Sequence, residues 1–172
     1  MRNPKAKIKN QNSSAAFSLI EVLIAMVLIG FAIAALVAAN GSFSMANVSG
    51  ADLSTAEFLV EQIRELTMIL PVVHPDVTNW ITLGPEAGET AATYNEVDDF
   101  DGATFCPPID PNRAALDHFA EFTQRVTVEK IDCRDFNHVV ADNDPNEFVR
   151  ITVSVAKGNR SITAANWIRA RY

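Results

Sequence analysis

Carboxylates form the densest group of potential ligands in this sequence. Asp98, Asp99 and Asp101 lie within four residues, and carboxylate oxygens are the ligands that calcium takes in proteins. The spacing does not fit the twelve-residue EF-hand loop, because placing Gly102 at the sixth position of that loop puts a valine at the first. We therefore expect a solvated acidic turn and no cofactor, with these three aspartates as the candidate ligands should calcium bind.

The remaining reactive side chains form no recognisable catalytic pattern. The histidines are scattered, and none has a serine or cysteine beside it in a motif for nucleophilic catalysis. The sequence contains no Gly-rich phosphate loop and no HExxH motif. We therefore expect a protein that is not an enzyme.

Two cysteines, Cys106 and Cys133, stand in the second half of the chain. In an exported domain a single disulfide is the default, because the compartment is oxidising. A bridge closing a loop of this length stabilises a fold by about 3–4 kcal/mol on the chain-entropy account. The alternative is two free thiols in a cytosolic core. Redox and zinc sites commonly use a Cys-x-x-Cys pair, and this sequence has none.

Charge is divided unequally along the chain. The net charge is −7, and residues 1–16 carry four basic side chains and no acid, so the other residues together stand at −11 (−7 minus +4). A basic tip ahead of an apolar segment keeps an N-terminus on the cytoplasmic side of a membrane. The acidic remainder would be repelled by phosphates, so we expect no binding to nucleic acid.

A long apolar run follows the basic tip. Residues 22–39 are 18 consecutive residues with no charged or hydrogen-bonding side chain, and a bilayer-spanning helix needs about 20. Extending the run back to Phe17 includes one acid, Glu21. A carboxylate costs about 2.5–3.5 kcal/mol at the centre of a membrane on insertion scales, although less near the interface. The presence of Glu21 in this apolar run therefore requires an explanation.

Three interpretations of this segment compete. A secretory signal peptide has a shorter apolar core that precedes its small-residue cleavage site, whereas Ala15 and Ala16 precede the run here. A plain signal anchor explains the span and the basic flank but not Glu21. A cut between Ala16 and Phe17 gives the acid a role, because it creates an α-amino group four residues from Glu21. An ammonium group and a carboxylate attract strongly at low dielectric and relieve each other's desolvation.

Residues 16–25, AFSLIEVLIA, resemble the prepilin-type cleavage and methylation motif of type IV pilins and type II secretion pseudopilins. The resemblance implies that an inner-membrane peptidase removes the leader and methylates Phe17. It also implies that Glu21 pairs with the N-terminal amine of a neighbouring subunit during assembly. The family usually has glycine where this chain has Ala16, and many major pilins have a helix-breaking proline where it has Ala38.

Helical periodicity continues beyond the apolar run. Weak helix formers at residues 40–42 and 49–50 predict a bend or a local loosening there. Apolar side chains then recur every three or four positions, at Ala56, Leu59, Ile63, Leu66 and Leu70. Pro71 bounds the end of this amphipathic helix, whose apolar face we expect to lie on a core.

Alternation of apolar and polar residues predicts antiparallel strands in the C-terminal third, at residues 125–129 and 149–155 and more loosely at 162–168. One long helix on a small antiparallel sheet predicts an α+β, pilin-like head. Between helix and sheet, residues 72–121 form a long loop of the kind that is usually functional or disordered. Within it, residues 94–102 resemble a segment of minor pilins of the mannose-sensitive haemagglutinin type.

These features predict three parts: a basic leader at 1–16, a transmembrane and filament-core helix at 17–39, and an amphipathic helix with a periplasmic α+β head at 40–172. The resemblance implies a minor type IV pilin, inserted in the inner membrane with its N-terminus in the cytoplasm and later carried to the pilus at the cell surface. The implied partners are other pilin subunits, the prepilin peptidase and the inner-membrane assembly platform. Two alternatives stay open: a minor pseudopilin of a type II secretion system, and, from another class, a signal-anchored periplasmic binding domain.

Overall fold

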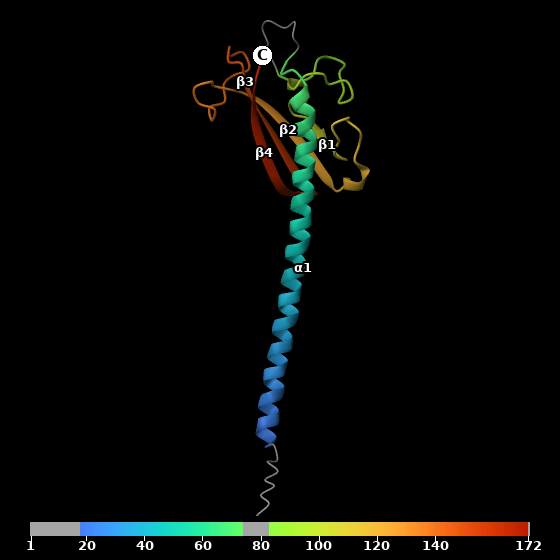
Figure 1. Cartoon of the computed structure of the whole chain (residues 1–172), viewed down its shortest axis with the longest axis vertical. Helices are drawn as coiled ribbons and strands as arrows, with labels where there is room; N and C mark the ends of the chain where they lie inside the picture. The colour runs from blue at the N-terminus through green and yellow to red at the C-terminus, as the bar shows by residue number, and fades with distance from the viewer. Residues whose placement is uncertain (1–17, 74–82, 172) are drawn as a thin grey trace, which may run out of the picture. The chain divides into compact units, whose positions relative to one another are not determined.

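The computed structural model describes residues 18–73 and 83–171, which contain one long helix and a four-stranded sheet (Figure 1). Helix α1 spans Leu19–Ile69. The strands are β1 (Thr104–Phe105), β2 (Phe122–Ile131), β3 (Phe148–Lys157) and β4 (Arg160–Ala170), and two short 3-10 helices, η1 (Asp98–Phe100) and η2 (Asp117–Phe119), precede β2. This layout confirms the predicted α+β, pilin-like fold class.

The predicted local loosening of the helix does not occur. α1 passes through residues 40–42 and 49–50 as one uninterrupted α-helix. A single glycine costs only about 1 kcal/mol relative to alanine, and helix propagation through good helix formers on both sides offsets that cost. The chain forms two compact units, residues 1–46 and 47–172.

The sheet of the second unit is antiparallel throughout, in the order β1-β2-β3-β4. β3 and β4 form a hairpin in which Lys157 faces Arg160 across a two-residue turn. Gly158 adopts a φ of 56° in this turn, in the left-handed region that glycine enters without steric cost. The Gly158-Asn159 pair is a residue combination that favours such a turn.

The apolar stripe predicted on the helix forms one side of the core. Ala56, Leu59, Ile63 and Leu66 are buried in one apolar cluster with the inward-facing residues of the sheet. Alternate residues of β3 supply much of the other side, namely Val149, Ile151, Val153 and Val155. Figure 1 shows the C-terminal half of α1 running alongside the sheet, so helical and strand periodicities meet in a single core.

A buried amide ties the helix to the sheet. The Gln124 side chain in β2 is fully buried, and its Nε2 donates to the Leu59 carbonyl at 2.8 Å and to the Ile109 carbonyl at 3.2 Å. Its Oε1 accepts from the Ile109 backbone N–H at 2.8 Å. One polar side chain thus joins α1, β2 and the segment before η2 with its hydrogen-bonding atoms satisfied.

The end of α1 is completed from another element. The last turn of the helix has no basic residue of its own. Arg169 of β4 donates from Nη1 to the carbonyls of Thr67 and Leu70. A guanidinium at this position satisfies carbonyls that have no partner within the helix and complements the helix dipole.

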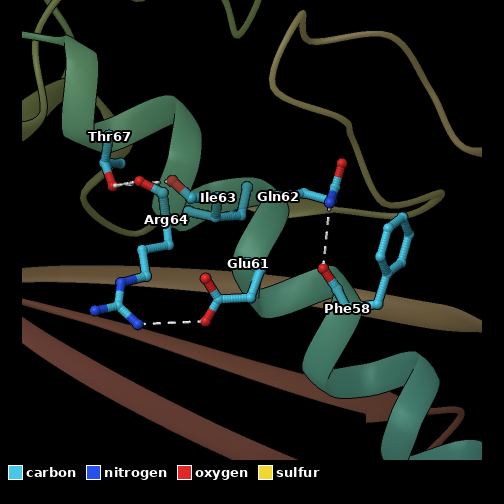
Figure 2. A network of polar contacts seen from close by, with 6 residues as sticks. All are labelled: Phe58, Glu61, Gln62, Ile63, Arg64 and Thr67. Carbon is cyan, nitrogen blue, oxygen red and sulfur yellow. Dashed lines mark hydrogen bonds and ion pairs between the residues drawn. The ribbon is translucent and has the colours of Figure 1, made fainter.

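The opposite face of α1 carries exposed polar contacts (Figure 2). Arg64 pairs with Glu61 at 3.3 Å, with both side chains about half exposed. On the same exposed side, Gln62 Nε2 donates to the Phe58 carbonyl. Thr67 lies on the core side instead, where its buried hydroxyl donates to the Ile63 carbonyl one turn earlier. The Arg64–Glu61 and Gln62–Phe58 contacts thus place polar groups on the outer face of the helix, as the amphipathic pattern predicts.

Candidate assembly interface

The first part of α1 buries none of its apolar side chains against the described part of the chain. Every residue from 19 to 51 is exposed, and large aliphatic and aromatic side chains recur along this stretch. Among the described residues, α1 is the one helix long and apolar enough to cross a membrane. At 1.5 Å per residue, residues 19–39 cover about 30 Å, the thickness of the hydrocarbon core.

Glu21 stands in the first turn of this helix, beside the residue that caps it. The Glu21 backbone N–H donates to the Ser18 hydroxyl at 3.2 Å, and the Val22 N–H donates to the Ser18 carbonyl at 3.3 Å. Ser18 and Glu21 have the Ser-x-x-Glu spacing of a capping box, and an acid in the first turn is favoured by the helix dipole. The start of the helix is therefore encoded locally, and its first turn places the Glu21 carboxylate at the N-terminal end of an apolar helix.

Ala16 and Phe17 lie outside the described residues. The cut between them, the methylation of Phe17 and its pairing with Glu21 accordingly stay predictions.

Comparison with known proteins gives one family match. Residues 11–37 match the family model described as the prokaryotic N-terminal methylation motif. This chain carries a prepilin-type N-terminus. The matched region contains Glu21 and most of the apolar run, and it supports a type IV pilin-like or pseudopilin-like protein, which is a structural subunit. No curated protein and no solved structure matches the chain.

The motif and the helix together fit a membrane-anchored subunit that is processed by a peptidase and assembles with other pilins. The motif occupies only the N-terminal part of the chain, and it is shared by pilins and pseudopilins. It therefore carries no information about the role of the head.

The predicted disulfide is contradicted by the sheet. Cys106 and Cys133 are both free and exposed. Cys106 follows β1, whose Phe105 pairs with Gln124 near the start of β2, whereas Cys133 lies beyond the end of that strand at Ile131. From Gln124 to Ile131 the strand covers about 23 Å, and a bridge requires Cα atoms within about 7 Å. A disulfide within one subunit is therefore excluded by the register.

The three candidate metal ligands face different partners. Asp101 Oδ1 accepts from the Val128 N–H at 2.8 Å and so fastens its turn to β2. Asp98 is buried, and desolvation followed by the nearby Asp99 charge raises the pKa of the Asp98 carboxyl to about 7. Only Asp99 lies in a group of carboxylates, and two of its neighbours there come from an earlier turn, at Glu86 and Glu89.

Glu86 and Glu89 were not singled out from the sequence. A signal was present, because Glu86 and Glu89 are three residues apart and so are Glu96 and Asp99. Each such pair places two carboxylates on one turn. Their meeting depends on how the loop folds back, which no local pattern shows. Burial, followed by the contact with the Asp99 carboxyl, raises the pKa of Glu96 to about 8.

Proposed function

We propose that this chain is a minor pilin of a type IV pilus, cut between Ala16 and Phe17, methylated at Phe17 and incorporated into the filament through α1. The observation that carries the proposal is the apolar part of α1, residues 19–39, in which every residue is exposed and the first turn holds a single carboxylate. A helix that is apolar all round is found inside a membrane or inside a bundle of other helices, and a pilin subunit passes from the first to the second.

Before assembly the helix lies in lipid. The basic leader holds the N-terminus in the cytoplasm, and the head lies in the periplasm. Lipid tails are as apolar as the helix surface, so exchange of lipid for neighbouring helices is driven by packing and by polar contacts, not by removal of apolar area from water. A polar contact at a defined height is therefore what selects the correct register.

Glu21 supplies that contact in the proposed mechanism. Its carboxylate meets the α-amino group of Phe17 on a neighbouring subunit, and each charge removes the other's desolvation cost. The carboxylate alone costs up to about 3 kcal/mol in the membrane. Subunits that dock with the pair formed are favoured over subunits displaced along the axis, because displacement leaves both charges unpaired.

The decisive experiment replaces Glu21 with valine and follows both membrane insertion and recovery in sheared filaments. We expect Glu21→Val to fractionate with the inner membrane like the unaltered chain and to fall at least tenfold in filaments. Glu57→Val is the matched control, since Glu57 is an exposed acid of the same helix within the head. Normal assembly of Glu21→Val would show that charge pairing is not the mechanism.

Processing is tested separately by intact mass. With the prepilin peptidase present, the chain should lose residues 1–16 and gain one methyl group. A chain that keeps its leader would instead support the signal-anchored periplasmic domain. Recovery of the processed chain with a secretion apparatus and not in sheared pili would support a pseudopilin of a type II secretion system.

A further inference from the structure

Four carboxylates of the head converge beside η1. Glu86, Glu89, Glu96 and Asp99 each place one oxygen so that all four oxygens lie within 4.8 Å of one another. Glu86 is exposed, Glu89 is half-buried, and Glu96 and Asp99 are buried. Like charges this close repel each other strongly where water is excluded, and a compensating positive charge, from a proton or from a cation, relieves that repulsion.

Asp99 points to what that charge is. Its side chain is completely buried, and its Oδ2 accepts from the backbone N–H groups of Asn95 at 2.9 Å and Glu96 at 3.0 Å. These two bonds fix the carboxylate in place. Its other oxygen, Oδ1, is buried without any hydrogen-bond partner in the described part of the chain. A buried carboxylate oxygen without a partner is costly, and a bound cation removes that cost.

The ion pairs among the described residues do not supply that cation. None of the ion pairs within residues 18–73 and 83–171 includes a member of this group. The nearby Arg113 guanidinium donates to the backbone carbonyls of Ala92 and Tyr94. These bonds brace the segment between Glu89 and Glu96.

We propose that Glu86, Glu89, Glu96 and Asp99 form a Ca²⁺ site in the head. The donor set consists of hard oxygens without nitrogen or sulfur, which favours Ca²⁺ or Mg²⁺ over zinc and copper. Four carboxylates suit Ca²⁺, which takes six to eight oxygen ligands in flexible geometry. Mg²⁺ usually binds one or two carboxylates and keeps most of its water.

Binding here would join two parts of the loop that follows α1. The turn at 86–89 is closed by the Glu89 N–H donating to the Glu86 carbonyl at 3.1 Å. The segment at 96–99 is attached to the end of the helix, because the Val97 N–H donates to the Pro71 carbonyl at 2.9 Å. A cation held by both would fasten the loop to the head. The site is independent of the assembly role of Glu21, so either proposal can fail alone.

The test uses the full chain in detergent micelles after treatment with EDTA, titrated with CaCl₂ by calorimetry and by thermal unfolding. We expect saturable binding with a Kd of about 10⁻⁴–10⁻³ M, the range of extracellular calcium modules. At about 10 mM CaCl₂ the unfolding midpoint should rise by about 5 °C, by mass action on the folded state. MgCl₂ at the same concentration should give less than half of that shift.

Glu86→Gln is the informative variant, because Glu86 is exposed and its replacement leaves the buried part of the head intact. It should weaken Ca²⁺ binding at least tenfold, and Asp99→Asn should abolish it. Glu65→Gln, an exposed acid on α1, is the matched control and should bind like the unaltered chain. If Asp99→Asn does not fold, Glu86→Gln decides. The proposal is overturned if the unaltered chain shows no saturable binding up to about 10 mM CaCl₂, if Glu86→Gln binds equally tightly, or if Mg²⁺ gives an equal shift.

Discussion

Asp52 joins α1 to the tip of the β3–β4 hairpin, and its replacement gives a quantitative test of the fold. The residue is 8% exposed. Its carboxylate accepts from Lys157 Nζ at 2.9 Å and from Arg160 Nη2 at 2.9 Å, which come from the two sides of the hairpin turn. Lys157 also pairs with Glu121 at 3.2 Å. We take Asp52→Asn as the perturbation, because it removes the charge and keeps the shape.

The magnitude follows from the exposure of the two cations. A hydrogen bond to a charged group contributes about 1.5–3 kcal/mol when it is shielded from water. The Lys157 side chain is 32% exposed, so its hydrogen bond to Asp52 is only partly shielded from water. The Arg160 side chain is 59% exposed, so solvent reduces the contribution of its bond to about 0.5 kcal/mol. We expect Asp52→Asn to lower the free energy of unfolding by about 2 kcal/mol, or the midpoint by roughly 6–8 °C for a domain of this size.

The control is the exposed pair in Figure 2. Glu61 and Arg64 are 53% and 49% exposed, so Glu61→Gln should cost less than about 0.5 kcal/mol. The assay is thermal unfolding of the full chain in micelles, followed by circular dichroism at neutral pH. Equal shifts for the two variants, or a shift below about 2 °C for Asp52→Asn, would refute the assignment of the Asp52 cluster as a shielded junction.

The difference in free energy of unfolding between the unaltered chain and Asp52→Asn should also depend on pH, and this dependence provides a second readout. Hydrogen bonds to Asp52 and then Glu121 raise the pKa of Lys157 above 10.5. A raised lysine pKa means that its contribution to stability is fully present below about pH 10.5 and is lost as the pH rises through the raised value. The difference in free energy of unfolding between the unaltered chain and Asp52→Asn should therefore be constant from pH 6 to about pH 10 and become smaller above that.

Two further predictions concern the head. Gln124→Leu should destabilise it by about 2–3 kcal/mol, measured by thermal unfolding, because a buried backbone N–H and carbonyl of Ile109 lose their partner; an unchanged midpoint would mean that the buried amide is not a tie between elements. Cys106 and Cys133 should both react with a maleimide without prior reduction, since both are free and exposed. If neither thiol is labelled, the result would support the disulfide predicted from the sequence.

Much of this architecture was predictable because its signals are local. The stripe from Ala56 to Leu66 repeats with the period of a helix, and the alternation at residues 149–155 repeats with the period of a strand. Each period states which side chains share a face, and burial of that face follows. The loosening expected near Gly41 does not occur, because the helix propensity cost of one glycine is small against the cooperativity of a helix of 51 residues.

The distance between the two cysteines could not be predicted from the sequence. Composition and compartment suggested a bridge, but the distance between Cys106 and Cys133 depends on which strand each adjoins and on the direction of that strand. The carboxylate group shows the same limit. Two pairs of acids at a spacing of three are visible in the sequence, whereas their approach requires the loop to fold back beside η1.

The sequence by itself determined the helix that is long and apolar enough to span a membrane, the position of Glu21 within it and the α+β class, since these depend on hydrophobic length, spacing and period. Tertiary structure alone decided which distant residues meet: Asp52 with the hairpin tip, Gln124 with the helix, and Asp99 with Glu86 and Glu89. The physical reason is that a charge or an amide has no preferred partner along the chain, and the partner it finds is fixed only when the register of the sheet and the course of the loop are fixed.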